Sequence, residues 1–401
     1  MGYIVKRNVL LKQKLLYTFL IICAYILGKE LPLYMIDVSY YYQQQVETET
    51  LLLKSISGDI HQCSIFALGI SPYIISSLIN MIVNAFKKSE AKRKISPVKT
   101  NKRIINLSLI LAIFMAIMQV QDMHFRVADG MLIVAKNVAV IEMVAGAMLI
   151  IRMVSNNKKY GIGGQSALIL VNITEGLIVT VKGYELKQLL LPLLICAVVI
   201  IVMLIMENGE KRIPVQRISI HNIYADKNYL AIKISPIGVM PVMFSMAVFL
   251  LLRLLIELFL VFSPENGVAL WCRDNVDMTK SFGILVYVVA IYILAVGFSR
   301  VMISPGELSE QYLKNGDSIQ DIRAGKDTKK YLSKSITGLS FASATVMGIC
   351  LSIPMYLQTK GILDSSLATL PTTVMMLTGI WSNLYREVVA VRDLEAYEPF
   401  I

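Results

Sequence analysis

Long apolar runs separated by short polar segments constrain the fold of this chain more than any other feature. Many runs approach the roughly 20 residues that a helix needs to cross the hydrocarbon core of a bilayer. Charged residues make up only 17% of the chain, against about a quarter in soluble domains. We therefore predict an all-α polytopic membrane protein with ten transmembrane helices. The predicted spans are 15–33, 64–84, 104–121, 131–151, 165–181, 188–206, 237–262, 281–303, 336–358 and 367–390.

The distribution of basic residues predicts how these spans are oriented. If the N-terminus is inside, the segments that face the cytoplasm hold 29 of the 39 lysines and arginines, and the outer segments hold 9. Cytoplasmic loops of membrane proteins carry such an excess of positive charge. We therefore expect a multi-pass protein of the cell membrane with both termini in the cytoplasm. The net charge of +11 follows from this topology and does not indicate nucleic-acid binding.

Ten spans divide naturally into two groups of five with opposite orientations. This division predicts two inverted halves, residues 1–184 and 185–401, around a central pore. The long cytoplasmic loops 207–236 and 304–335 both belong to the second half. We expect a two-stranded hairpin in the first loop, and in the second a short amphipathic helix from Glu307 to Leu313 with a glycine-containing tip. Both loops are candidates either for docking a cytosolic partner or for simple solvated connectors.

The sequence gives little support for catalysis. Five cysteines and three histidines are scattered without metal-ligand spacing, and no GxxxxGK[ST] phosphate loop is present. We therefore predict no catalytic residues, no cofactor and no metal, and assign any use of nucleotide energy to a partner. Glu142 and Glu175 lie within spans, and membrane carboxylates often mark transport pathways. A secondary transporter or a flippase for lipid-linked sugars thus remains an alternative.

The second predicted span combines an apolar composition with residues that weaken a helix. From Ser64 it reads SIFALGISPYIISSLINMIV, with Gly69, Pro72, several serines and Asn80. Small residues allow neighbouring membrane helices to approach closely. We expect this span to form a seam that can separate again, and we expect Pro72 to bend its helix.

Several motifs then appear in an order that resembles the SecY family of protein-conducting channels. They are SIFALGISPYIISSLI, YGIGGQS, EKRIPVQ, LAIKISPIGVMPVMFS and SPGELSEQYLKNG. The segments LPLYMIDVS and DIRAGKDT and the short tail AYEPFI are more similar to the accessory branch of that family in Gram-positive bacteria. The resemblance implies a channel that passes unfolded preproteins across the cytoplasmic membrane. The housekeeping channel of the family is the alternative.

The resemblance also implies partners and site residues. The partners would be an accessory motor ATPase of the SecA type, small membrane subunits of the SecE and SecG type, and serine-rich glycosylated surface proteins as cargo. The channel would open sideways between the second and seventh spans. A ring of apolar side chains can hold water back by dewetting a narrow pore. The implied ring is Ile70, Ile74, Ile169 (or Leu170 in the other register), Met243 and Val374; the implied motor-docking residues are Arg212, Arg323 and Lys326; the implied plug is segment 51–62 with Lys54, Asp59 and Ile60.

Overall fold

The computed structural model describes residues 9–37, 63–85, 97–121, 123–127, 129–216, 229–263, 266–277 and 280–397. Within these ranges each predicted span contains one helix, which confirms the predicted helical membrane fold. The ten helices are α2 (Val9–Lys29), α5 (Ser71–Ala85), α7 (Pro97–Gln121), α8 (Leu132–Tyr160), α9 (Gln165–Lys182), α10 (Leu186–Asn208), α11 (Met240–Phe262), α13 (Ser281–Ile303), α15 (Lys326–Thr359) and α16 (Ser365–Tyr397). The other elements are η1 (Asp129–Met131), α12 (Gly267–Asn275), α14 (Pro305–Asn315), β1 (Glu210–Gln216), β2 (Tyr229–Lys233) and β3 (Ser318–Ile319).

Eight of the described helices are long and apolar enough to cross a membrane on their own. The two exceptions among the ten are α5 and α16. Helix α5 has only 15 residues, and α16 mixes serine and threonine with its apolar residues. Helix α5 and the first half of α16 are largely buried inside the bundle, where polar groups and short helices are tolerated because protein rather than lipid surrounds them.

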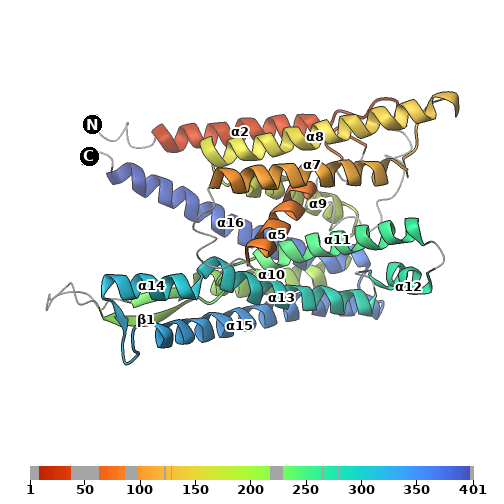
Figure 1. The fold of residues 1–401 in the computed structure, drawn as a ribbon. Helices are drawn as coiled ribbons and strands as arrows, with labels where there is room; N and C mark the ends of the chain where they lie inside the picture. Colours follow the sequence, from red (N-terminus) through yellow and green to blue (C-terminus); the bar gives the residue numbers. More distant parts are fainter. Residues whose placement is uncertain are drawn as a thin grey trace.

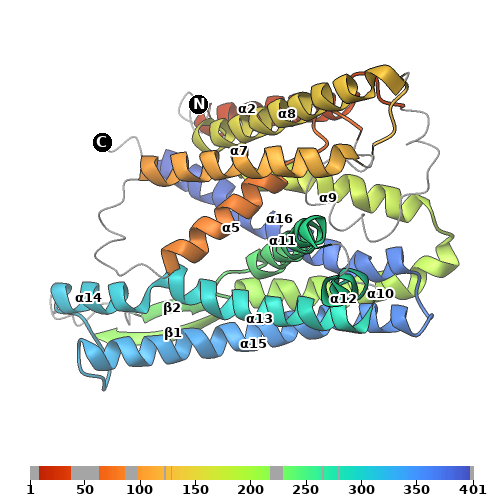
Figure 2. The same ribbon diagram turned by 45° about the vertical axis from the view of Figure 1, so that its right-hand side comes forward.

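Six of the remaining helices form two groups on opposite sides of these two. In both views α2, α7 and α8 lie on one side of the molecule, and α10, α13 and α15 lie on the other (Figures 1 and 2). Helices α5, α9, α11 and α16 lie between the groups, where α5 contacts α11 and α9 contacts α16. Helix α2 begins, α16 ends and α14 projects at the same end of the molecule (Figure 1).

The outer faces of the helices are apolar, as a surrounding bilayer requires. On α10, for example, Leu186 is 84% exposed and Leu190 is 69% exposed. On α2, Leu16 and Phe19 are also more than half exposed. Water would not favour so much exposed apolar surface on a soluble monomer, whereas lipid tails solvate it.

A small antiparallel sheet connects the two large loops of the second half. Strands β1 and β2 form the predicted hairpin, with Arg212 opposite Ala231. The sequence did not predict β3, which pairs with the other edge of β1 through Val215 and Ile319. The buried side chains of this sheet pack on the start of α15, so the two loops form one body. The buried members of that cluster are Ile213, Ile232, Ile319, Leu332 and Ile336.

Candidate functional site

Four of the five predicted ring residues lie together in the main apolar core. Ile70 and Ile169 are fully buried, and Ile74 and Met243 are nearly so. They come from the segment before α5, from α9, from α5 and from α11, which are the elements between the two groups of helices. Val374 of α16 instead is half-buried and packs against a neighbouring cluster that contains Leu367 and Leu370. The buried side chains that α16 contributes to the main core are Met375, Met376 and Ile380.

The second span does not form a single bent helix, and the expected role of Pro72 was wrong. Residues 65–70 form consecutive turns, and α5 begins only at Ser71. Gly69 has a φ of +54°, a conformation that glycine adopts without steric cost. Pro72 therefore lies in the first turn of α5, where a helix has no use for its missing N–H group. The carbonyl of Ile70 accepts hydrogen bonds from the N–H groups of Tyr73 and Ile74, each at 3.1 Å, so Ile70 and Ile74 remain one turn apart.

A glycine turn fixes the start of α9 and, with it, Ile169. The side chain of Asn157, buried at the end of α8, donates to the carbonyls of Ile162 at 3.0 Å and Gly164 at 2.9 Å. The hydroxyl of Thr18 on α2 donates to Oδ1 of Asn157 at 2.9 Å and accepts from the N–H of Ile162 at 2.8 Å. Buried polar groups that are all satisfied in this way hold a turn in one conformation. Helices α2, α8 and α9 therefore meet at a fixed point.

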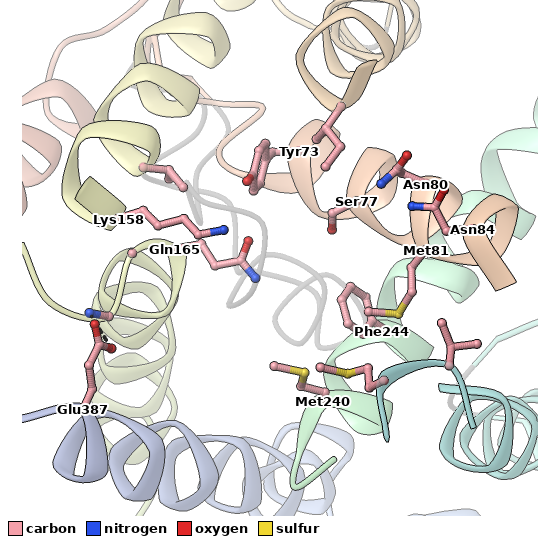
Figure 3. A pocket seen from close by; sticks show the side chains of 16 residues that line it. Tyr73, Ser77, Asn80, Met81, Asn84, Lys158, Gln165, Met240, Phe244 and Glu387 are labelled. Carbon is pink, nitrogen blue, oxygen red and sulfur yellow. Dashed lines mark hydrogen bonds between the residues drawn. The ribbon is translucent and has the colours of Figure 1, made fainter. Parts of the chain in front are cut away.

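A cavity of about 530 Å³ with polar and apolar walls lies beside this apolar core (Figure 3). It is lined by α5, α7, α8, α9, α11, the end of α13 and α16, and one wall is the glycine turn. The N–H of Gly163 in that wall donates to Glu387 on α16 at 3.0 Å. The labelled polar side chains around the cavity are Tyr73, Ser77, Asn80, Asn84, Lys158, Gln165 and Glu387. The lining also includes Met81, Met240 and Phe244, so the cavity offers apolar as well as polar contacts.

The boundary between α5 and α11 is made of small polar and flexible apolar side chains. The hydroxyl of Ser76 donates to the carbonyl of Pro72 at 2.7 Å, and that of Ser77 donates to Ile74 at 2.8 Å. On the facing helix, Ser245 donates to Val242 at 2.7 Å. Each hydroxyl is thus satisfied within its own helix, so separation of α5 from α11 leaves none of these donors unpaired. This arrangement explains how a buried seam can carry so many serines.

The helix pair α13 and α15 provides a contrast, because its polar side chains do bond across the interface. The hydroxyl of Ser340 donates to that of Ser299 at 2.6 Å. Nε of Arg300 donates to Oγ1 of Thr337 at 3.0 Å. Separation of these two helices would therefore break hydrogen bonds, which identifies the α5–α11 boundary as the less tightly joined of the two.

The predicted motor-docking residues lie on the body formed by the two large loops. Arg212 is exposed on β1, with its guanidinium 4.8 Å from the ring centre of Tyr229. Arg323 is exposed in the turn after β3, and Lys326 is the exposed first residue of α15. A hydrogen bond to the backbone stabilises this turn: the hydroxyl of Thr328 donates to the carbonyl of Arg323 at 2.9 Å. The pairing of β1 with β3 brings the loop of Arg212 and the loop of Arg323 together.

The two membrane glutamates have partners in the neighbouring segments. Glu142 accepts a hydrogen bond from the N–H of Tyr34 at 2.9 Å. Glu175 on α9 forms an ion pair with Lys29 on α2, whose side chain is only 5% exposed. Lys29 also reaches Oδ1 of Asn172 at 3.3 Å. Both carboxylates therefore tie elements together, which accounts for their presence without an ion pathway. In the part of the chain that the structure describes, no cluster of His, Cys, Asp and Glu could hold a metal ion.

Three groups of site residues differ in how far the sequence could reveal them. Lys54, Asp59 and Ile60 of the proposed plug lie outside the described residues. Tyr73 and Asn80 were visible as polar positions within an apolar run. Lys158, Gln165 and Glu387, by contrast, come from three other elements, and no local signal in the sequence links them to the cavity.

Accessory translocase subunits from Gram-positive bacteria resemble this chain over almost its whole length. The accessory Sec system protein translocase subunit SecY2 of Leuconostoc gelidum subsp. gasicomitatum is 24% identical over 412 residues, which cover 97% of this chain and 96% of that protein. The SecY2 subunit of Streptococcus agalactiae serotype III is 27% identical over 404 residues, which cover 98% and 97%.

Solved structures show the same fold at lower sequence identity. A protein-conducting channel superposes with a TM-score of 0.67 at 17% identity, covering 96% of this chain and 93% of that one. The Sec61 channel of the canine ribosome–channel complex superposes with a TM-score of 0.62 at 16% identity and the same coverage. The family model for SecY matches residues 64–385. Because that model matches four fifths of its length, this chain belongs to the SecY family.

Proposed function

We propose that this chain is the central channel subunit of an accessory protein translocase, which passes unfolded preproteins across the cytoplasmic membrane. The observation that carries the proposal is the buried apolar cluster of Ile70, Ile74, Ile169 and Met243, beside a cavity of about 530 Å³ that is lined by both polar and apolar side chains. A narrow apolar constriction blocks water and ions while idle. The adjacent cavity receives the extended chain, and the serine-rich seam between α5 and α11 allows membrane segments to leave sideways.

The accessory assignment rests on the names of the relatives, which are SecY2 subunits at 24% and 27% identity over nearly all of this chain. The proposed cargo, serine-rich glycosylated surface protein, follows from the resemblance of the sequence motifs to the accessory branch of the family. We assign both termini to the cytoplasm on the basis of the excess of lysine and arginine in the corresponding loops. We place the boundary between the two halves at residues 184–185, in the connection between α9 and α10. Segment 51–62 is proposed as the plug.

A motor ATPase of the SecA type is the proposed energy source, and its docking surface is the body of β1, β2, β3, α14 and the turn before α15. Arg212, Arg323 and Lys326 are exposed there. An exposed, rigid and basic surface next to the cavity suits a partner that pushes a chain inward. Small subunits of the SecE and SecG type are proposed as the membrane partners, with the bilayer around them.

Replacing Ile70 with asparagine is expected to make the idle channel leak ions. Burial of an unpaired amide in the constriction attracts water, and a barrier lowered by about 1.4 kcal/mol raises ion flux tenfold. We expect an increase of at least about tenfold in potassium flux from liposomes that contain the purified channel. The matched control is Ile82→Asn, on α5, which follows directly after Ile70; Ile82 is 37% exposed and lies outside the cluster. Equal fluxes from the two variants would show that Ile70 does not line the constriction.

Deletion of the gene tests the proposed function directly. We expect selective loss of a serine-rich glycosylated surface protein from the cell surface, with secretion of bulk proteins intact, as measured by mass spectrometry of both fractions. Loss of bulk secretion and of viability would instead assign the chain to the housekeeping channel. If neither fraction changed, the channel function itself would be contradicted, and transport of a small molecule would have to be tested.

A further inference from the structure

A basic groove lies where α13 meets the first half of α15, away from the apolar constriction. Its volume is about 920 Å³. It runs from the first residue of α15 to Phe341, a distance of about 22 Å along a helix that rises 1.5 Å per residue. One end therefore lies beside the large loops, and the other lies at the level of the predicted ninth span. The lining residues are Arg300, Lys326, Lys329, Lys330, Ser333, Lys334, Thr337, Gly338 and Phe341.

The groove concentrates positive charge, and Asp327, the carboxylate in the first turn of α15, is not among its lining residues. Five of its lining residues are lysine or arginine, and none is a carboxylate. Lys326 and Lys330 are four residues apart on α15, as are Lys330 and Lys334, and like charges at this spacing repel each other along a helix. The first turns of α15 also carry the positive end of the helix dipole, which disfavours lysine there. Among the described residues, none of these four lysines has a carboxylate as an ion-pair partner. A bound anion would relieve all of these repulsions.

Arg300 is held in position for such an anion. Its Nε donates to Oγ1 of Thr337 at 3.0 Å, which fixes the guanidinium against the wall of the groove. The two terminal nitrogens remain to form a bidentate contact, and the flat guanidinium suits the oxygens of a phosphate group. The lysines supply mobile point charges around it.

The opposite end of the groove is apolar and continuous with the lipid-facing surface. Phe341 is 58% exposed, and its ring centre lies 5.2 Å from that of Tyr292 on α13. Beyond it along the same two helices, Ile293 is 66% exposed and Ile349 is 52% exposed. An occupant with a phosphate head and a hydrocarbon tail would satisfy both ends, whereas free phosphate or an acidic peptide would leave the apolar end uncovered.

We propose that this groove binds the headgroup of an anionic phospholipid, with one acyl chain lying along Phe341 and the outer faces of α13 and α15. Basic pockets between membrane helices bind such headgroups. The site is separate from the constriction and from the seam between α5 and α11. It places a lipid directly beneath the turn that carries Arg323, so the composition of the membrane would influence the proposed docking surface.

The test uses the full-length purified protein without a motor. Native mass spectrometry measures the retention of added phosphatidylglycerol and phosphatidylcholine by the wild-type chain and by the groove variant Lys329→Gln/Lys330→Gln/Lys334→Gln. Each basic residue near an anionic lipid surface accounts for about a fivefold change in binding. We therefore expect the groove variant to lose affinity for phosphatidylglycerol by at least about tenfold. The matched control, Lys99→Gln/Lys102→Gln/Arg103→Gln, removes three exposed cations from the start of α7 and is expected to bind like the wild type.

Several results would overturn the assignment. Equal retention of the two lipids by the wild type, or full retention of phosphatidylglycerol by a groove variant that elutes as a folded protein, would exclude a specific lipid site. Displacement of phosphatidylglycerol by millimolar inorganic phosphate would show that the groove takes free phosphate. In a separate binding assay with the motor, loss of motor binding by a groove variant that still retains phosphatidylglycerol would assign the groove to an acidic segment of the motor. Because the lipid measurement contains no motor, it is independent of whether the channel exports the proposed cargo.

Discussion

Replacing Arg386 with methionine is expected to destabilise the folded channel by roughly 3 kcal/mol, because it leaves a buried carboxylate without its counter-charge. Nη1 of Arg386 lies 3.1 Å from Oε2 of Glu207, and the side chain of Glu207 is 1% exposed. Arg386 is on α16 and Glu207 is near the end of α10, so the pair joins two long helices of the second half. The measurement is the thermal unfolding of the purified protein in detergent.

The two partners of this pair are not equivalent, which sharpens the prediction. Arg386 also donates to the backbone carbonyl of Glu207 and, at 3.5 Å, to the side chain of Asn208. When Glu207 is changed to glutamine, the guanidinium of Arg386 therefore still has hydrogen-bond acceptors and remains partly exposed to solvent. Among the described residues, Oε1 of Glu207 and Nη1 of Arg386 are both buried without a hydrogen-bond partner. We expect Glu207→Gln to cost about 1 kcal/mol, well below the cost of Arg386→Met.

The controls separate loss of the pair from loss of any arginine. Arg392→Met, on the same helix, removes the partner of Asp393 from an ion pair that is 61% and 59% exposed. Exposed pairs contribute at most about 1 kcal/mol, so this variant is expected to unfold near the wild-type temperature. The double variant Glu207→Gln/Arg386→Met should be more stable than Arg386→Met alone, since no uncompensated charge remains. If Arg386→Met and Arg392→Met unfolded at the same temperature, the buried pair would not stabilise the fold.

The helices of this protein follow from its apolar runs, because a segment that crosses lipid must satisfy its backbone internally and expose apolar side chains. The residues at which the helices begin are predicted less well by these runs. Helix α15 begins at Lys326, ahead of the predicted start at residue 336, because its first turns lie outside the apolar run. Conversely, α5 begins later than predicted, since Gly69 and Pro72 favour turns and a helix start rather than a bend.

Contacts between distant residues could not be read from the sequence. Strand β3 has two residues, and its pairing with β1 depends on the packing of the sheet on α15. Asn157 is bonded to Thr18, 139 residues away. The cavity likewise draws Lys158, Gln165 and Glu387 from three different helices. The predicted ring, however, could be placed by resemblance, because its residues lie at fixed positions relative to recognisable motifs. Val374 is the exception among the ring residues. The family register places it in the ring, but it packs against the cluster that contains Leu367 and Leu370 and not in the main apolar core.

Replacing Arg323 with glutamate is expected to reduce export of the cargo to background while leaving the channel folded. The side chain of Arg323 is exposed, and only its backbone carbonyl is used in the turn, as acceptor for Thr328. A charge reversal there does not disturb the fold. At a docking surface, however, it exchanges an attraction for a repulsion, and a loss of only 1.4 kcal/mol lowers affinity tenfold. The measurement is the amount of serine-rich glycoprotein on the cell surface, with channel abundance determined by immunoblot.

The matched control for this variant is Lys314→Glu, which makes the same change in charge at an exposed position near the end of α14 in the same loop. If a general basic potential attracts the motor, both variants should lower export equally, and their loss of motor binding, measured with the purified channel, should be largest at low salt concentration, where surface charges are least screened. If Arg323 makes a specific contact, only Arg323→Glu should abolish export, and its loss of motor binding should be present at any salt concentration. Because β3 joins the turn of Arg323 to the strand of Arg212, Arg212→Glu should then give an intermediate loss of export. Normal export by Arg323→Glu would exclude this surface as the motor-docking site.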